Sequence, residues 1–329
     1  MTKPEKLTSE FDLIARHFTR PAANAVLGVG DDAALIAPSP GFEIAASVDM
    51  LVEGRHFFPG AEAEALGHKT LAVNLSDLAA MGATPRWALL ACALPSVDEA
   101  WLAAFARGFF ALADEHAVDL VGGDTTRGPR DLCVTVLGEV PAGKALRRSG
   151  ASGGDSIWVS GKLGDAALAI AHQLGRIRLE GADLAACENA LARPVPRVTL
   201  GLALRGIASA AIDVSDGLVG DLGHVLSASR IGATIDLDAL PRSAALERQL
   251  GGADRAIALQ CLLAGGDDYE LCFTAPRARD ARIAAIGDKL GLPLTRIGIA
   301  TAQRAGLEVR DASGRALEPL PRAFDHFAP

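Results

Sequence analysis

The sequence has few aromatic residues, no excess of positive charge and no long uncharged apolar run. Aromatic residues make up 5% of the 329 residues, and the formal net charge is −8. A nucleic-acid-binding protein usually carries a basic patch or a basic overall balance, so nucleic acid is not an expected partner. No apolar run reaches the roughly 18 residues of a membrane span, and the first residues lack the apolar segment of a signal peptide. We therefore expect a globular, cytoplasmic protein that binds small molecules or metal ions and no membrane.

Cysteine is also scarce. The five cysteines are scattered, odd in number and free of any CxxC or Cys/His spacing typical of zinc sites. We predict buried thiols without a catalytic or metal-binding role. These residues are Cys92, Cys133, Cys187, Cys261 and Cys272.

Glycine is abundant, with 35 residues, and short apolar runs alternate with segments of helical periodicity. This alternation predicts an α/β (α+β) fold, and the length allows two domains. A Gly-, Arg- and Ser-rich stretch places the boundary between an N-terminal domain at 1–147 and a C-terminal domain at 148–329. Strands are expected at 41–52, 86–95, 117–124, 131–140, 156–160, 210–216, 233–240 and 269–276. Helices are expected at 8–20, 62–81, 97–116, 164–175, 197–210, 218–229 and 277–290.

Aspartates recur where these apolar runs end or turn. Ligands of α/β sheets commonly bind beside the carboxyl ends of strands, so these carboxylates are expected to converge on one site. Magnesium fits such a set best, because it prefers carboxylate oxygens and bridges them to phosphates. Any single aspartate could instead cap a turn, and we interpret the repeated GGD at 122–124 and 265–267 as a repeated turn type. The aspartates are Asp31, Asp32, Asp49, Asp77, Asp124, Asp213, Asp216, Asp267 and Asp268.

Two common nucleotide motifs do not account for this pattern. GVGDDA at 28–33 formally fits the dinucleotide pattern GxGxxG/A, but two aspartates would face the pyrophosphate. Pro38 and Pro40 also follow too soon for the required helix. The lysines in GKA at 143–145 and GKL at 161–163 are not followed by the Ser or Thr of a P-loop. ATP, if bound, is held in another way.

Seven motifs occur in order between about residue 9 and residue 327: GVGDDAAL, SVDMLVEGRHF, NLSDLAAMGATP, GGDTTRG, IDVSDGL, GGDDYELCF and FDHF. Together they resemble the thiamine-monophosphate kinase family, which belongs to a superfamily with aminoimidazole ribonucleotide synthetase. The resemblance implies a homodimer whose N-terminal domains pair their sheets. It also implies that the C-terminal domain completes a site in which several Mg²⁺ ions bridge ATP and thiamine monophosphate.

The resemblance also implies roles for individual residues. The metal-binding positions are Asp31, Ser47, Val48, Asp49, Asp77, Asp124, Asp213 and Asp216. The ATP-contacting positions are Gly123, Asp124, Arg148 and Ser215, and the substrate-contacting positions are His56, Asp267 and Phe324. Val48 stands where many members have Thr and would bind metal through its backbone carbonyl; Asp267 stands where many have Glu. Asp32 would orient the ligands or cap the turn, and Tyr269 would serve packing.

The implied reaction is direct in-line transfer of the ATP γ-phosphate to thiamine monophosphate, which gives thiamine diphosphate and ADP. The acceptor is already an anion, so we expect no general base and no catalytic side chain beyond the metal ligands. Two alternatives stay open: another ATP-dependent enzyme of the superfamily, of the ligase type, and a non-catalytic protein that binds nucleotide or thiamine phosphate.

Overall fold

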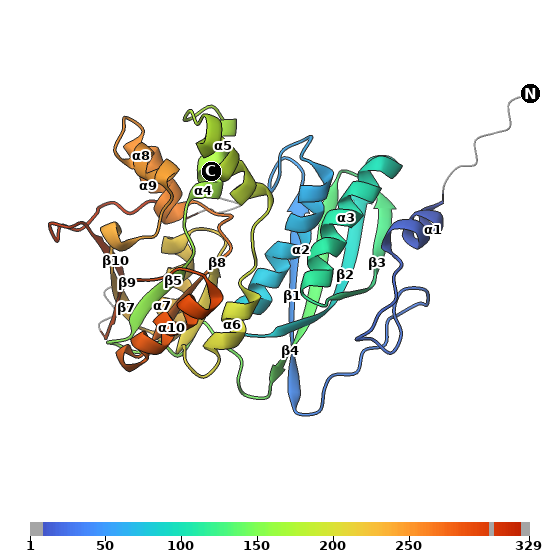
Figure 1. Cartoon of the computed structure of the whole chain (residues 1–329), viewed down its shortest axis with the longest axis horizontal. Helices are drawn as coiled ribbons and strands as arrows, with labels where there is room; N and C mark the ends of the chain where they lie inside the picture. The colour runs from blue at the N-terminus through green and yellow to red at the C-terminus, as the bar shows by residue number, and fades with distance from the viewer. Residues whose placement is uncertain (1–8, 303–305, 324–329) are drawn as a thin grey trace, which may run out of the picture. The chain divides into compact units, whose positions relative to one another are not determined.

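The computed structural model describes residues 9–302 and 306–323, which form two compact units (Figure 1). The first unit holds the described residues up to Leu78 together with Thr84–Ala142, and the second holds Ala79–Ala83 and the described residues from Gly143 onward. Each unit combines helices with one sheet, which confirms the predicted α/β class. In the described ranges, no helix is both long and apolar enough to cross a membrane. The functional division into domains 1–147 and 148–329 stays a prediction.

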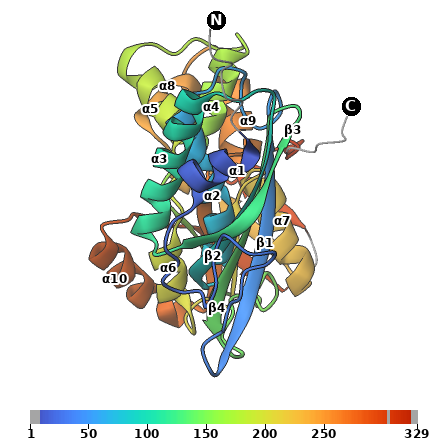
Figure 2. The same ribbon diagram turned by 90° about the vertical axis from the view of Figure 1, so that its right-hand side faces the viewer.

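The first unit is a four-stranded sheet with helices on one face (Figure 2). Strand β4 is antiparallel to both β1 and β2, and β3 runs parallel to β2, in the order β1-β4-β2-β3. Helices α2 and α3 approach closely at two glycines: a Cβ on Gly108 would lie 1.8 Å from the carbonyl oxygen of Glu64. The elements are α1 Glu10–Leu13, η1 Ile14–Phe18, β1 Phe42–Val52, α2 Ala63–Ala80, β2 Thr84–Leu94, α3 Glu99–Glu115, β3 Asp119–Arg127 and β4 Asp131–Pro141.

The second unit is built on a six-stranded sheet in the order β10-β7-β9-β5-β8-β6. Its pairs are antiparallel except β10 with β7. Strands β5, β6 and β8 are buried along their whole length. The elements are β5 Ser156–Ser160, α4 Asp165–Gln173, α5 Gly181–Ala192, α6 Val198–Leu204, β6 Ala210–Val214, α7 Leu218–Ser229, β7 Gly232–Asp236, η2 Leu237–Ala239, α8 Ala244–Leu250, α9 Arg255–Ala264, β8 Glu270–Ala275, η3 Arg277–Arg279, α10 Asp280–Leu290, β9 Leu294–Thr301 and β10 Leu307–Arg310.

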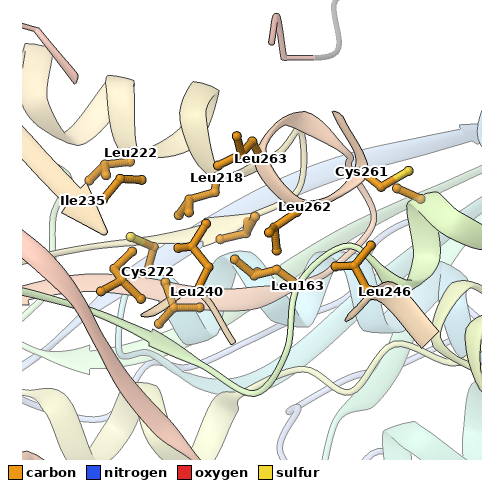
Figure 3. Close-up of a cluster of buried hydrophobic side chains, with 14 of the residues drawn as sticks. Leu163, Leu218, Leu222, Ile235, Leu240, Leu246, Cys261, Leu262, Leu263 and Cys272 are labelled. Atoms are coloured by element: carbon orange, nitrogen blue, oxygen red, sulfur yellow. The ribbon is translucent and has the colours of Figure 1, made fainter. Parts of the chain in front are cut away.

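The core of the second unit joins helices α7 and α9 to the sheet (Figure 3). Leu218 and Leu222 of α7 lie in the same buried cluster as Leu262 of α9 and Cys272 of β8. Such burial agrees with the cysteine prediction. All five cysteines are free thiols, and Cys133 alone is only half-buried. Burial raises the pKa of Cys92, Cys187 and Cys261 to about 12, so these thiols stay protonated at neutral pH.

Several expected elements differ in extent. The helix expected at 8–20 begins after the capping residue Ser9, but only Glu10–Leu13 is α-helical before a π-helical turn follows. The helix predicted at 197–210 ends at Leu204, because the chain turns at Gly206, whose φ is +70°, before β6 begins. Five elements have no counterpart among the predicted ones: α5, α8, α9, β9 and β10.

The interpretation of GGD as one repeated turn is wrong. Residues 122–124 lie inside strand β3, whereas residues 265–267 form a turn between α9 and β8. The prediction that the aspartates stand at strand ends or turns is also wrong for Asp49 in β1, Asp77 in α2 and Asp124 in β3. Most neighbouring strands are antiparallel and therefore do not end at the same edge of the sheet; among the described strands, β3 with β2 and β10 with β7 are the parallel pairs.

Candidate active site

In the first unit, helix α2 gathers a polar cluster beside strand β1. Strand alternation places Ser47 and Asp49 on the same face of β1. The Ser47 hydroxyl donates a hydrogen bond to the Asp77 carboxylate. The side-chain oxygen of Asn74 accepts the backbone N–H of Asp49 at 3.0 Å, and its amide donates to the Thr70 carbonyl, also at 3.0 Å. Three predicted metal-binding residues, Ser47, Asp49 and Asp77, therefore lie together.

Asn74 was not predicted as a site residue. It is fully buried and stands three residues before Asp77, which places both side chains on one face of α2. Asparagine is seldom fully buried in a protein. Its position among apolar residues of a predicted helix was the signal in the sequence that could have identified it.

The same unit holds Asp124 far from this cluster. Met50 of β1 pairs with Cys133 of β4, which pairs with Ala91 of β2, and Ala91 pairs with Asp124 of β3. Asp124 is thus separated from β1 by three strand spacings, about 14 Å. Oxygen ligands of one Mg²⁺ ion lie about 2 Å from it, so Asp49 and Asp124 of one copy cannot bind the same ion.

Gly123, next to Asp124, has no room for a side chain. Its φ is +151°, and a Cβ there would lie 1.9 Å from the carbonyl oxygen of Leu90 on the neighbouring strand. Val48 is 58% exposed, and strand alternation puts it on the face of β1 opposite to Asp49.

Asp31 and His56 lie in turns of the first unit. The Asp31 carboxylate accepts the backbone N–H of Asp32 at 2.9 Å, and both residues are exposed. The two adjacent aspartates are therefore joined by a local hydrogen bond. The Nδ1 atom of His56 accepts the backbone N–H of Val52 at 2.9 Å, which leaves the proton of the neutral ring on Nε2.

In the second unit, one buried carboxylate organises the turn that follows β6. A single oxygen of Asp221 accepts the backbone N–H groups of Ser215, Asp216 and Gly217, each at 3.1 Å. Asp221 is 3% exposed. Burial raises its pKa to about 7, although these backbone hydrogen bonds oppose the shift.

The turn before β8 is tied directly to the turn after β6. The backbone N–H of Asp267 donates to the Ser215 carbonyl at 2.9 Å, and that of Tyr269 donates to the Val214 carbonyl at 2.8 Å. The Tyr269 hydroxyl donates to the Asp267 carboxylate at 3.0 Å. Tyr269 is buried as predicted, but it also orients Asp267. The second unit therefore brings Ser215, Asp216 and Asp267 together next to Asp213, the fourth residue of β6.

This second turn has a strained backbone. Asp267 and Tyr269 have φ angles of +70° and +50°, which side-chain-bearing residues seldom adopt. Between them, the Asp268 carboxylate accepts the Gly164 N–H at 2.8 and 3.0 Å. Asp268 is half-buried, and the burial of its carboxylate raises its pKa well above the usual range. Asp268 thus anchors the turn to the start of α4.

Arg148 is another predicted residue that lies apart from these two groups. Arg148 is exposed, and its carbonyl accepts the hydroxyl of Ser229 at 3.2 Å, at the end of α7 opposite to Asp221. Phe324 lies outside the described residues. Among the described residues, no three Asp, Glu, His or Cys side chains are grouped closely enough to hold a metal ion. The predicted carboxylates are divided between the two units.

Comparison with known proteins identifies the family. Residues 30–140 match the AIR synthase related protein N-terminal domain, and residues 152–310 match the C-terminal domain. The chain is 48% identical to the thiamine-monophosphate kinase of Salmonella typhimurium, over 97% of this chain and 98% of that protein.

Solved structures agree. The crystal structure of thiamine-monophosphate kinase from Stenotrophomonas maltophilia matches with a TM-score of 0.83 and 49% identity, over 93% of this chain and 95% of that one. A structure described as AaThiL complexed with AMPPCP and TMP matches with a TM-score of 0.76 and 29% identity, over 88% and 89%. The chain thus belongs to the thiamine-monophosphate kinase family of AIR synthase related proteins.

Proposed function

We propose that this chain transfers the γ-phosphate of ATP to thiamine monophosphate and releases thiamine diphosphate and ADP. The observation that carries the proposal is the identity of 48% with a thiamine-monophosphate kinase over nearly the full length of both proteins. The AaThiL structure, with AMPPCP and TMP bound, is consistent with the same pair of substrates. The ligase-type and binding-protein alternatives gain no support from any particular feature of the structure.

The predicted ligand set suits Mg²⁺. Its donors are carboxylates, one hydroxyl and one backbone carbonyl, with no thiolate or imidazole, and the Ser47 hydroxyl already contacts the Asp77 carboxylate. Bound Mg²⁺ would neutralise the charge shared by the two phosphate groups. The residues proposed to hold several Mg²⁺ ions are Asp31, Ser47, Val48 through its carbonyl, Asp49, Asp77, Asp124, Asp213 and Asp216.

The protein's own contribution is alignment. Because the acceptor is a phosphate oxygen, the chain need not remove a proton, and we assign no general base. Asp267, held by Tyr269, and His56, with its proton on Nε2, are proposed to bind thiamine monophosphate. Gly123, Asp124, Arg148 and Ser215 are proposed to bind ATP. A covalent phosphoenzyme is not expected.

We further propose a homodimer formed through the first unit. Strand β1 is an edge strand of 11 residues with exposed apolar side chains, among them Val48 at 58% and Met50 at 53%. Such an edge is a template for pairing with another chain. The separation of Asp49 from Asp124 gives a second reason, since a second copy could supply ligands that one copy holds apart. The free, mostly buried thiols suit the cytoplasmic location that we also propose.

One assay tests the function. Purified protein is incubated with ATP, magnesium and either thiamine or thiamine monophosphate, and thiamine diphosphate is measured. We expect product from the monophosphate alone. Product from thiamine, or none from the monophosphate, would contradict the proposal. Light scattering of wild-type protein and the Met50→Lys variant tests the dimer: the wild type should have twice the monomer mass, and the variant should be shifted toward monomer.

A further inference from the structure

Asp221 is a buried carboxylate to which the proposed reaction gives no role. It lies in the first turn of α7, with Leu218 and Leu222 of the same helix in the apolar core (Figure 3). Its side chain turns back toward the start of the helix and is 3% exposed. Three N–H donors on one carboxylate oxygen make a stronger anchor than a single cap.

The donors show what this carboxylate holds. An ordinary helix cap binds N–H groups of the first helical turn, which here would belong to residues 218–220. Asp221 instead binds the N–H groups of Ser215, Asp216 and Gly217, all of which precede the helix. Its hydrogen bonds therefore fix the shape of the turn ahead of the helix.

The turn at residues 215–217 holds the turn at residues 266–269 in position. The Ser215 carbonyl accepts the N–H of Asp267, so the path of residues 215–217 sets the position of residues 266–269. The packing is close: a Cβ on Gly266 would lie 2.5 Å from the Ser215 carbonyl oxygen, and a Cβ on Gly217 would lie 2.6 Å from the Ala264 carbonyl carbon. A shift of the first turn must therefore displace the second.

We propose that Asp221 is a positioning residue for phosphoryl transfer, which holds Ser215 and Asp216 on the ATP and metal side in register with Asp267 on the substrate side. The inference rests on the proposed function. It assigns Asp221 no contact with substrate or metal; the residue acts through the backbone of residues 215–217.

The test compares Asp221→Leu, which keeps the approximate size but removes the acceptor, with Asp221→Asn, which keeps one acceptor oxygen. Asp155→Leu is the matched control, because Asp155 is also buried in the second unit and accepts the Ser152 N–H at 3.0 Å, away from the predicted site. Each variant is examined without ligand by amide hydrogen exchange and, in the kinase assay, by the magnesium concentration that gives half-maximal activity.

For Asp221→Leu we expect amide exchange of residues 215–217 and 266–269 to be about 100-fold faster, from the loss of several charge-assisted hydrogen bonds. The magnesium requirement should rise about 10-fold, as for loss of a residue that orients metal ligands. Asp221→Asn should recover most of both effects. If Asp221→Leu does not fold, Asp221→Glu replaces it, and its longer stem should raise both quantities.

The inference is overturned if the folded Asp221 variant changes exchange at 215–217 and the magnesium requirement no more than Asp155→Leu does. A wild-type protein that makes no thiamine diphosphate overturns the proposed function instead, and the exchange measurement still decides whether Asp221 holds the two turns.

Discussion

The two units present their predicted ligands in different ways. In the first unit, Ser47 and Asp49 stand on a regular strand, and a helix places Asn74 and Asp77 against them. In the second, Ser215, Asp216 and Asp267 stand on turns that are held by backbone hydrogen bonds and a buried carboxylate. A strand needs no special support for its shape, whereas a turn with positive φ angles does. We therefore expect activity to depend on the predicted ligands themselves in the first unit. In the second unit it should also depend on the residues that hold the turns in place.

The largest effect should come from the strand side. Asp49→Asn removes a carboxylate charge while its backbone N–H can still reach Asn74. A metal ligand provides several kcal/mol of charge stabilisation, so we expect a loss of turnover of about 1,000-fold or more. Steady-state kinetics and circular dichroism, with Glu43→Gln on the same strand as control, check this. Near-normal activity of a folded Asp49→Asn protein would contradict the metal role.

The adjacent residues Asp31 and Asp32 allow a comparison between a predicted metal ligand and its neighbour in the first unit. Asp31→Asn retains an oxygen that can accept the Asp32 N–H, so the turn should persist. Loss of an outer partner typically costs about 10- to 100-fold in metal affinity, so loss of a direct ligand at Asp31 should cost about 100-fold or more. Asp32 is not a predicted direct ligand, so Asp32→Asn should raise the magnesium requirement much less than Asp31→Asn does. The magnesium concentration that gives half-maximal activity is measured for both variants. Equal increases would contradict the prediction that only Asp31 binds metal directly.

A smaller effect is expected on the turn side. Tyr269→Phe keeps the buried ring but removes the hydroxyl that orients Asp267. One hydrogen bond to a charged group is lost, so KM for thiamine monophosphate should rise about 5-fold while KM for ATP stays the same. An equal rise in both constants would mean that the substitution disturbs the whole turn, and no change would mean that the hydroxyl does not position Asp267.

The smallest effects concern pH, and the two units should differ in sign. Burial raises the pKa of Asp268, so the folded state retains a proton that the unfolded state releases above its pKa near 3.8. The stability that protonated Asp268 contributes to the folded state is therefore lost as pH rises above about 3.8. Asp268→Asn should become progressively more stable relative to wild type between pH 5 and pH 8, roughly the range in which folded proteins are most stable.

Glu139 in the first unit is the opposite case. Burial raises its pKa, but the hydrogen bonds from Ser39 and Arg86 outweigh burial and lower it. Its contribution is present at neutral pH and is lost as pH falls through the folded pKa. Glu139→Gln should therefore be destabilised at neutral pH, with the difference shrinking in acid. Urea unfolding across pH measures both variants, and parallel curves would contradict the contrast.

Much of the fold followed from local pattern. The helix expected at 218–229 is α7, and the apolar run at 41–52 is β1, because periodicity and flanking glycines are local signals. Helix α9 was missed because its sequence, RAIALQCLLA, is apolar on almost every side and gives no helical stripe. Strand β10 was missed because its four residues are too few to show alternation.

The site was less predictable. Motifs identified Asp49, Asp213 and Asp267 as candidates, but the expectation that such residues stand at strand ends or turns was wrong for Asp49, which lies inside β1. No spacing rule indicated that Asp221 would accept three N–H groups from a preceding turn, or that Asn74 would hold the backbone of Asp49. These contacts join buried polar groups, whose partners depend on how helices pack against strands.

The sequence alone determined the family, the α/β class and the residue types available for chemistry. The reason is that motifs, periodicity and charge are features of short segments of the chain. Three contacts or separations depend on tertiary structure alone. Ser47 donates a hydrogen bond to Asp77, and the Ser215 carbonyl accepts the N–H of Asp267. Asp124 lies at the opposite edge of the sheet from Asp49. The physical reason is that strand order and hydrogen-bond register bring together residues far apart in sequence, and local propensities do not encode that order.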